Sequence, residues 1–430
     1  MAPKPEKRKK KENADLETKR IKGDHQPSLE VVVDEKPLCK YGEKCYQKNP
    51  LHLKKFKHPH RETVVQPQSK TEDEKAESIS DSDSSTSSSH SKNEEIPDMG
   101  SIKTSVENEV DDAQLPPSPT DVKENIKQKF LVEMPFDFYQ FWEFAQSILS
   151  QNSTLEVFKE SLGLELVGPF QLLNQSVENK STEKFNSLTQ WCFYYDPPEF
   201  QTVIIGDLST GFHIGYFRDS PKEIPAFVGS NTESEGCIIT PMGENLFSAL
   251  SHFISVKQQK SDPFKKSQLA SLRKKLEDWA TNNKIPIEPQ SHTLKKRKQK
   301  MVAKTFYECG IVVPIDKKTK VGYRKIPETD ANIKKICKKI LESPNLEEQN
   351  KNSDSLQELV TYVQYANDEC DYGMGLELGL DLLAFGGEVF HPTILHLLEV
   401  AYELLEREEF GVLLKAHLKE RRRLTRSVSE

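Results

Sequence analysis

The chain has 430 residues, of which 35% are hydrophobic and 30% charged, and its formal net charge is −7. This composition is too polar for one globule throughout, and no apolar run approaches the roughly 20 residues that a membrane span needs. The N-terminus is Lys-rich rather than a secretory signal, and seven mostly well-separated cysteines indicate a reducing compartment instead of a disulfide framework.

The first 34 residues form a basic tail with two clusters, Lys7–Lys11 and Lys19–Lys22. Two basic clusters about ten residues apart are typical of a bipartite nuclear-import signal. The alternative is a solvated basic tail without a receptor. The sequence therefore favours a nuclear protein.

Residues 35–60 contain four potential zinc ligands with the spacing C-x5-C-x6-H-x5-H, namely Cys39, Cys45, His52 and His58. Two thiolates and two imidazoles supply the tetrahedral set that zinc prefers. A segment this short has no core of its own, so metal binding, at roughly 10–16 kcal/mol, has to supply the folding free energy. The alternative is a chance cluster in a polar tail, which Gly42 at a turn position and an apolar Phe56 argue against.

This segment resembles the PBZ, or poly(ADP-ribose)-binding, zinc finger rather than a DNA-reading C2H2 finger, in which about twelve residues separate the inner Cys and His. The matching positions are Lys36, Cys39, Tyr41, Gly42, Cys45, Lys48, His52, Phe56, His58 and Pro59. The resemblance implies that Tyr41 and Tyr46 stack on adenine while basic side chains such as Lys48 meet the pyrophosphate. Gln47 departs from the family pattern, which has a basic residue at this position. The departure affects how tightly the finger would bind the polymer and not its zinc ligands.

Residues 61–127 are dominated by Ser, Asp, Glu and Lys, with hardly any aromatic residue. Such a segment cannot bury enough apolar surface to offset its chain entropy. We therefore predict a disordered acidic linker between the finger and the body of the protein.

Aromatic density rises at Phe136, and the rest of the chain predicts an α+β fold, with an α+β subdomain over 128–290 and a mainly helical subdomain over 291–425. Strands are expected at Gln201–Asp207, His213–Phe217 and Ile224–Ser230, with further strand-like runs at 308–315 and 320–326. Helices are expected at 136–149, 244–254, 331–343 and 355–369, and over a long C-terminal pattern at 393–421. The basic stretch Lys295–Lys300 is expected to be a solvated loop, with nucleic-acid contact as the alternative.

The most unusual segment is Tyr362–Asp381, YVQYANDECDYGMGLELGLD. One helical face is predicted to carry Leu356, Leu359, Val360, Val363, Asn367 and Cys370. Asp368 and Glu369 then point away from that face, and Asp371 adds a third negative charge. A glutamate beside a polar substrate suits proton abstraction, although acidic residues at a helix end are most often solvated surface.

The segments VGYRKIPETDANIKKICKKI and VTYVQYANDECDYGMGLELGLDL resemble the histone PARylation factor family, over about 130–418. The resemblance implies a nuclear accessory protein that docks on the catalytic domain of a DNA-damage-activated poly(ADP-ribose) polymerase and acts on histones. Glu369 would be the general base for a serine hydroxyl, Asp368 would shape the local charge, and Tyr323 and Arg324 would contact the polymerase. The implied cofactors are a structural Zn²⁺ and an NAD⁺ that the partner enzyme binds.

Three functions therefore remain in competition. The first is a serine ADP-ribosylation cofactor at DNA breaks, which would have no independent activity and would meet DNA only indirectly. The second is a non-catalytic ADP-ribose-reading adaptor or scaffold. The third is an ADP-ribose hydrolase using Asp368 and Glu369, which the absence of a phosphate-cradling Gly-rich motif disfavours.

Overall fold

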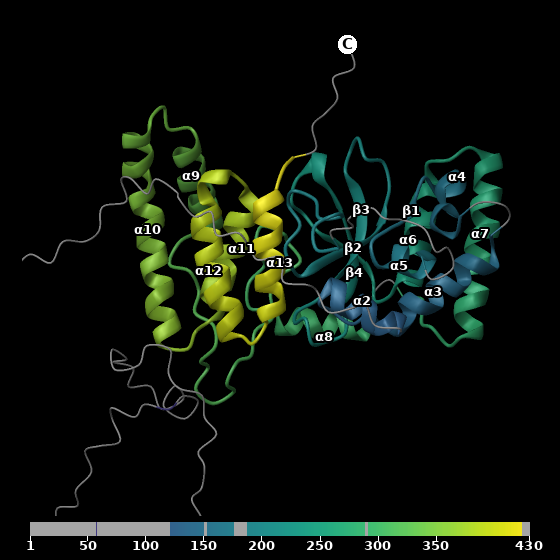
Figure 1. The fold of residues 1–430 in the computed structure, drawn as a ribbon, viewed down its shortest axis with the longest axis horizontal. Helices are drawn as coiled ribbons and strands as arrows, with labels where there is room; N and C mark the ends of the chain where they lie inside the picture. The colour runs from purple at the N-terminus through teal and green to yellow at the C-terminus, as the bar shows by residue number, and fades with distance from the viewer. Residues whose placement is uncertain (1–56, 58–120, 150–152, 176–186, 289–290, 424–430) are drawn as a thin grey trace, which may run out of the picture. The chain divides into compact units, whose positions relative to one another are not determined.

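A computed structural model describes residue 57 and residues 121–149, 153–175, 187–288 and 291–423 of the chain. The chain divides into two compact units, Met1–Ser82 and Asp83–Glu430, and the second is the one whose fold is described here. The basic tail, the finger and most of the acidic linker predicted from the sequence lie outside the described residues. The described part of the second unit is α+β, as predicted, with helices on both sides of one sheet (Figure 1).

The sheet is a five-stranded antiparallel meander in which the strands neighbour one another in chain order. The strands are β1 (Glu165–Leu166), β2 (Phe200–Ile205), β3 (Phe212–Phe217), β4 (Phe227–Thr232) and β5 (Thr240–Gly243). The predictions for β2 and β3 are confirmed within one residue at each start. The third predicted strand starts too early, because Ile224 and Pro225 belong to the β3–β4 connection and Ile224 is 81% exposed.

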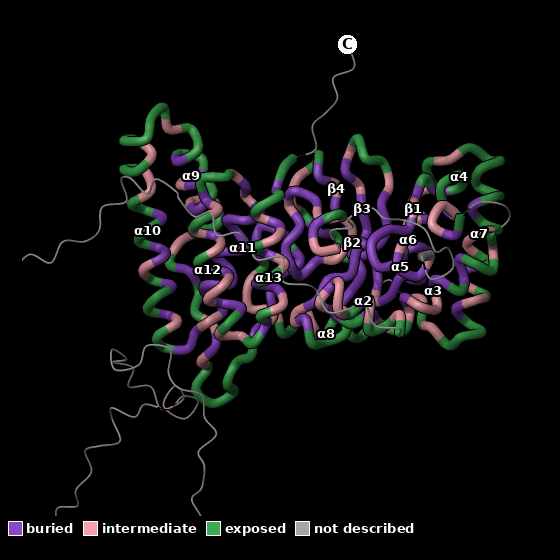
Figure 2. The backbone as a smooth tube through the Cα atoms, viewed as in Figure 1, coloured by how far each residue is buried: buried purple, intermediate pink, exposed green. Residues whose placement is uncertain are grey.

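The two faces of the sheet belong to two hydrophobic cores. Tyr216 and Val228 face the N-terminal helices, whereas their chain neighbours Phe217 and Phe227 face the C-terminal helices. Such alternation follows from the two-residue period of a strand. The core on the C-terminal side therefore contains residues of both subdomains predicted at 128–290 and 291–425, and buried residues run continuously through the centre of Figure 2.

The N-terminal side is built around aromatic residues of α3, which pack on Phe158, Phe170 and Phe247. Its α-helices are α2 (Val122–Phe130), α3 (Phe136–Ser147), α4 (Lys159–Leu162), α5 (Pro169–Gln175), α6 (Leu246–Gln259) and α7 (Pro263–Asn282). The sequence predicted a linker as far as residue 127, and this is wrong at its end, because α2 begins at Val122 and buries Ile126 completely.

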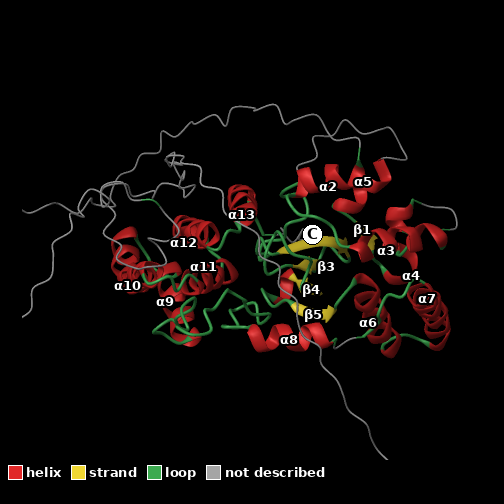
Figure 3. Cartoon of the chain, turned by 90° about the horizontal axis from the view of Figure 1, so that it is seen from below, coloured by secondary structure: helices red, strands yellow, loops and turns green. Residues whose placement is uncertain are grey.

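The C-terminal part of the chain forms α8 (His292–Lys300), α9 (Asp330–Leu341), α10 (Leu346–Asp368), α11 (Gly373–Phe385), α12 (His391–Leu404) and α13 (Glu408–Glu420). The almost wholly buried α11 packs against α9, α10 and α12, whereas α8 lies apart from these helices and closer to the sheet (Figure 3). The helical pattern predicted at 393–421 is confirmed and consists of two helices, α12 and α13. The chain breaks at Glu406, whose φ of 60° is left-handed, and Arg407 donates its N–H back to the carbonyl of Tyr402.

Two local predictions are corrected by the structure. The runs 308–315 and 320–326 form no strand and contribute only isolated bridges, Ala303 with Ile311 and Tyr323 with Tyr372. Left-handed residues interrupt both runs, and Pro314 cannot donate to a ladder. The stretch Lys295–Lys300 is helical rather than a loop, because Ser291 caps α8 and Arg297 pairs with Asp219 at 2.7 Å.

Candidate catalytic and partner-binding site

The end of α10 places Glu369 at the surface. Val360 and Val363 bury the opposite face of the helix, as predicted, and Glu369 forms its C-cap with a side chain 60% exposed. Cys370 then adopts a left-handed φ of 66°, and Asp371 donates its N–H to the carbonyl of Ala366 at 2.8 Å. This reversal ends the helix and starts the turn that leads into α11.

The predicted face of α10 is largely correct. Leu356, Leu359, Val360 and Val363 are buried, and Cys370, which lies just beyond the helix, is 8% exposed. Asn367 is only half-buried, and its Oδ1 is enclosed without a hydrogen-bond partner within the described residues. Asp368 and Glu369 are both exposed, as predicted, and face away from the core.

The loop 322–324 lies directly against this turn, although 45 residues of sequence separate Arg324 from Glu369. Asp371 is buried, and its Oδ1 accepts a hydrogen bond from the N–H of Gly322 at 2.9 Å. The N–H of Gly373 donates to the carbonyl of Gly322 at 3.0 Å. These two bonds hold the segments together through buried groups.

Arg324 contacts two of the three neighbouring carboxylates. Its Nη2 donates to Glu369 Oε2 and lies 3.2 Å from Asp371 Oδ2. The hydrogen bond to Glu369, with a smaller contribution from Asp371, raises the pKa of the guanidinium. The side chains of Arg324 and Glu369 are 45% and 60% exposed, so their ion pair contributes little net free energy. A stronger acceptor could therefore replace Glu369 as the partner of Arg324.

Tyr323 points the other way, into the protein. It is half-buried, and its hydroxyl donates to Glu377 Oε2 on α11 at 3.0 Å. Burial and the nearby Glu377 carboxylate raise the pKa of the phenol. Of the two residues predicted to contact a partner, Arg324 has a side chain that is 45% exposed, whereas the hydroxyl of Tyr323 is bonded to Glu377.

Two exposed aromatic residues that the sequence reading did not single out lie on the same helix. Tyr362 and Tyr365 are 41% and 57% exposed, one to two turns before Glu369. Both lie outside the apolar stripe of α10, so the helical periodicity of the sequence already indicates that they are exposed. Large aromatic side chains left in solvent beside charged groups are typical of protein interfaces.

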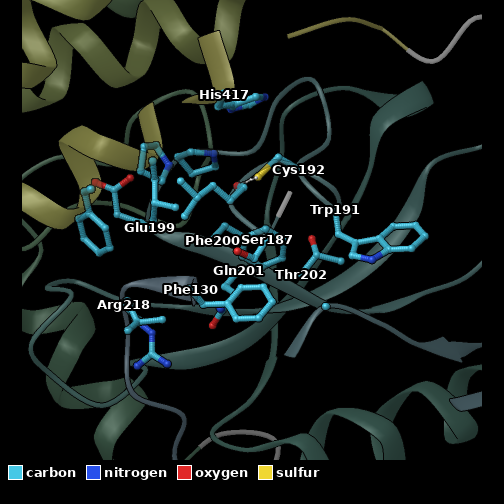
Figure 4. Close-up of a pocket in the computed structure, with 17 residues that line it drawn as sticks. Phe130, Ser187, Trp191, Cys192, Glu199, Phe200, Gln201, Thr202, Arg218 and His417 are labelled. Carbon is cyan, nitrogen blue, oxygen red and sulfur yellow. Dashed lines mark hydrogen bonds between the residues drawn. The ribbon is translucent and has the colours of Figure 1, made fainter. Parts of the chain in front are cut away.

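Other carboxyl groups are buried within the fold. Burial raises the pKa of Glu377 to about 7, that of Asp381 to about 8 and that of Glu199 to about 7. Glu199 accepts a hydrogen bond from Tyr402 at 2.9 Å and lines a cavity of about 50 Å³ beside Cys192, Arg218 and His417 (Figure 4). That volume holds only a few water molecules, so this cavity is not the candidate site.

The predicted zinc ligands Cys39, Cys45, His52 and His58, and the predicted ADP-ribose contacts Tyr41, Tyr46 and Lys48, lie outside the described residues. Within the described ranges, no group of three or more His, Cys, Asp or Glu side chains is placed to hold a metal ion. Among the cysteines of the described residues, Cys309 and Cys337 are buried, and Cys192 and Cys237 are partly buried. None of the described helices is long and apolar enough to cross a membrane.

Comparison with known proteins identifies relatives of both parts. The profile of the family described as histone PARylation factor 1 matches residues 121–421, and the PBZ domain profile matches residues 36–61. The histone PARylation factor 1 of Bos taurus is 44% identical over 306 residues, which cover 70% of this chain and 88% of the relative. The proteins of the same name from Mus musculus and Danio rerio are each 42% identical over 70% of this chain, covering 87% and 86% of their own length.

Proposed function

Because this chain belongs to the histone PARylation factor 1 family, we propose that it is a nuclear cofactor for ADP-ribosylation of histones. It docks on the catalytic domain of a poly(ADP-ribose) polymerase and directs modification to serine in the DNA damage response. The names of its relatives support the histone PARylation role. The basic clusters Lys7–Lys11 and Lys19–Lys22 support entry into the nucleus.

The observation that carries the catalytic part of the proposal is the position of Glu369. Its carboxylate is exposed at a helix end that buried hydrogen bonds through Asp371 hold in place. A base that another protein's active site is to use has to project from the surface and keep a defined backbone position. Glu369 meets both requirements.

In the proposed reaction, Glu369 accepts the proton of a substrate serine hydroxyl, because a neutral hydroxyl is a poor nucleophile. The serine oxygen attacks the anomeric carbon of the nicotinamide riboside in the NAD⁺ that the polymerase holds. The bond to nicotinamide breaks, nicotinamide leaves, and a serine–ribose bond forms. Asp368, beside Glu369, adds negative charge that favours a positively charged protein substrate.

Arg324 is the proposed anchor on the polymerase. In the free protein its guanidinium forms ion pairs with Glu369 and Asp371, so docking has to break the pair between Arg324 and Glu369. An acceptor on the polymerase that binds Arg324 bidentately would do so, because a desolvated pair of this kind is stronger than an exposed one. Partner binding and release of the base are then one event, and the free protein is inactive. The exposed Tyr362 and Tyr365 extend the same docking surface along α10.

The N-terminal finger is proposed to bind poly(ADP-ribose) and thereby to recruit the protein to modified chromatin. The match of residues 36–61 to the PBZ profile supports this role. Two thiolates and two imidazoles, from Cys39, Cys45, His52 and His58, are a donor set that suits structural zinc. Tyr41, Tyr46 and Lys48 are the proposed contacts to the polymer.

The experiment combines a polymerase, NAD⁺ and a histone peptide with wild type or Glu369→Gln. The substitution keeps size and removes the base, so serine modification should fall about 10²- to 10⁴-fold while docking on the polymerase is retained. Glu347→Gln, an exposed charge loss at the far end of α10, is the matched control and should behave as wild type. Equal serine modification by wild type and Glu369→Gln would favour the non-catalytic adaptor, and removal of ADP-ribose by the isolated chain would favour the hydrolase.

A further inference from the structure

The Tyr323 side chain lies along the first turns of α11. A Cβ added to Gly373 would lie only 3.0 Å from Tyr323 Cδ2, so the ring packs against bare helix backbone at that position. One turn further, the phenol hydroxyl reaches Glu377 Oε2 at 3.0 Å. Gly373 and Glu377 are four residues apart on one helix face, which matches the length of a tyrosine side chain.

Glu377 is an unusual residue for its surroundings. All residues from Gly373 to Ala384 are buried, and apart from Glu377 and Asp381 they are apolar or glycine. A buried carboxyl group costs free energy unless a specific hydrogen bond compensates it. Asp381 accepts a hydrogen bond from the N–H of Phe306 at 2.8 Å, and Glu377 accepts one from the hydroxyl of Tyr323 at 3.0 Å. Burial raises the pKa of Glu377 and the bond from Tyr323 lowers it, with Asp330 and Lys325 acting in opposite directions nearby.

The backbone of the loop is fixed at the same place. Tyr323 forms a bridge with Tyr372, and Gly322 bonds to both Asp371 and Gly373. In an extended segment, successive side chains point to opposite sides. With Tyr323 turned inward onto Glu377, Arg324 is turned outward onto Glu369.

We propose that Glu377 is a positioning residue, which holds the Tyr323 hydroxyl and thereby fixes the rotation of the loop that presents Arg324 to the polymerase. Tyr323 then supports partner binding from inside the protein rather than by direct contact. This inference rests on the proposed function, since it takes Arg324 to be the anchor.

The test uses the full-length protein and measures its affinity for the polymerase catalytic domain. Glu377→Leu removes the acceptor and should weaken binding about tenfold, as should Tyr323→Phe, which removes the donor. Glu377→Gln keeps an acceptor oxygen in the same place and should restore binding to within about threefold of wild type. The double variant Tyr323→Phe/Glu377→Leu should be no weaker than either single variant, because both remove the same bond.

A purely structural role would give a different pattern. If Glu377→Leu lowers the thermal midpoint but the folded protein binds like wild type, or if the effects of the two single variants add, the inference is wrong. It is also wrong if Glu377→Gln binds as weakly as Glu377→Leu. Failure of the proposed function is distinguishable, since wild type would then not bind the polymerase, or Arg324→Glu would bind as well as wild type.

Discussion

Arg324 and Glu369 form an ion pair across the surface of the folded protein, and Asp371 holds the loop and the helix end that carry them. In the proposed mechanism, the docking residue Arg324 and the catalytic residue Glu369 neutralise each other in the free protein, so activity depends on the partner. The relationship links the two halves of the proposed mechanism in one contact.

Reversing the charge of Arg324 should abolish docking. In Arg324→Glu, three carboxylates would face one another at residues 324, 369 and 371, and the anchor would repel its acceptor on the polymerase. We expect at least a hundredfold loss of affinity, roughly 3 kcal/mol, by calorimetry or pull-down. Lys274→Glu, the same charge change on an exposed position of α7, is the control and should bind normally. Undiminished binding of Arg324→Glu would remove the anchor from the mechanism.

Stability should fall as pH rises from 6.5 to 8, and Asp381 should make the largest single contribution among the three buried carboxyl groups with raised pKa values. Burial raises the pKa of Asp381 to about 8 in the folded protein, whereas in the unfolded chain it ionises near 3.9. Between these values the folded state holds a proton that the unfolded state has lost, so the free energy of unfolding is full at low pH and declines through pH 8. Each pKa unit corresponds to about 1.4 kcal/mol.

The measurement is the thermal midpoint of wild type and Asp381→Asn at several pH values in this window. Asparagine keeps the Oδ1 that accepts the N–H of Phe306 and has no proton to lose. The variant should therefore show a flatter profile, with the remaining slope due to Glu199 and Glu377, whose raised pKa values are each about 7. Parallel profiles for the two proteins would show that Asp381 ionises in the same way whether folded or unfolded.

Two glycine substitutions should have opposite effects on stability. A Cβ at Gly379 would lie 2.6 Å from two side-chain atoms of Leu398, so Gly379→Ala should force α11 and α12 apart and cost about 1–3 kcal/mol. Gly411 lies in α13 with nothing within 4 Å of a Cβ, so Gly411→Ala should stabilise by about 0.5–1 kcal/mol through helix propensity. Denaturant unfolding of both variants tests the packing, and a stable Gly379→Ala would contradict the close contact.

Removing zinc should separate recruitment from docking. We expect about one zinc per chain by native mass spectrometry, and Cys39→Ser should lose it together with poly(ADP-ribose) binding. Docking on the polymerase should persist, because Arg324 and Glu369 belong to the other compact unit. Retention of polymer binding in the zinc-free protein would place the reader elsewhere in the chain.

Local periodicity was sufficient to predict much of the fold. The aromatic helix α3, the strands β2 and β3 and the buried face of α10 all follow patterns with a range of a few residues, and the structure confirms them. The strand predictions at 308–315 and 320–326 were wrong because both runs contain β-branched Ile and Val residues, which favour strands. Both runs contain left-handed residues and bond to distant parts of the chain, which are tertiary features. One example is the bond that Arg407, in the α12–α13 connection, donates to the carbonyl of Val312 at 2.8 Å.

The sequence by itself determined the α+β class, the zinc-ligand pattern and the exposure of Asp368 and Glu369, because these depend on residue type and helical or strand period. Only the tertiary structure decided that Arg324 pairs with Glu369, that Tyr323 turns inward onto Glu377, and that one sheet serves two cores. Contacts between residues far apart in sequence depend on how α10, α11 and the preceding loop pack in three dimensions. No local pattern records the buried hydrogen bonds of Asp371 that bring them together.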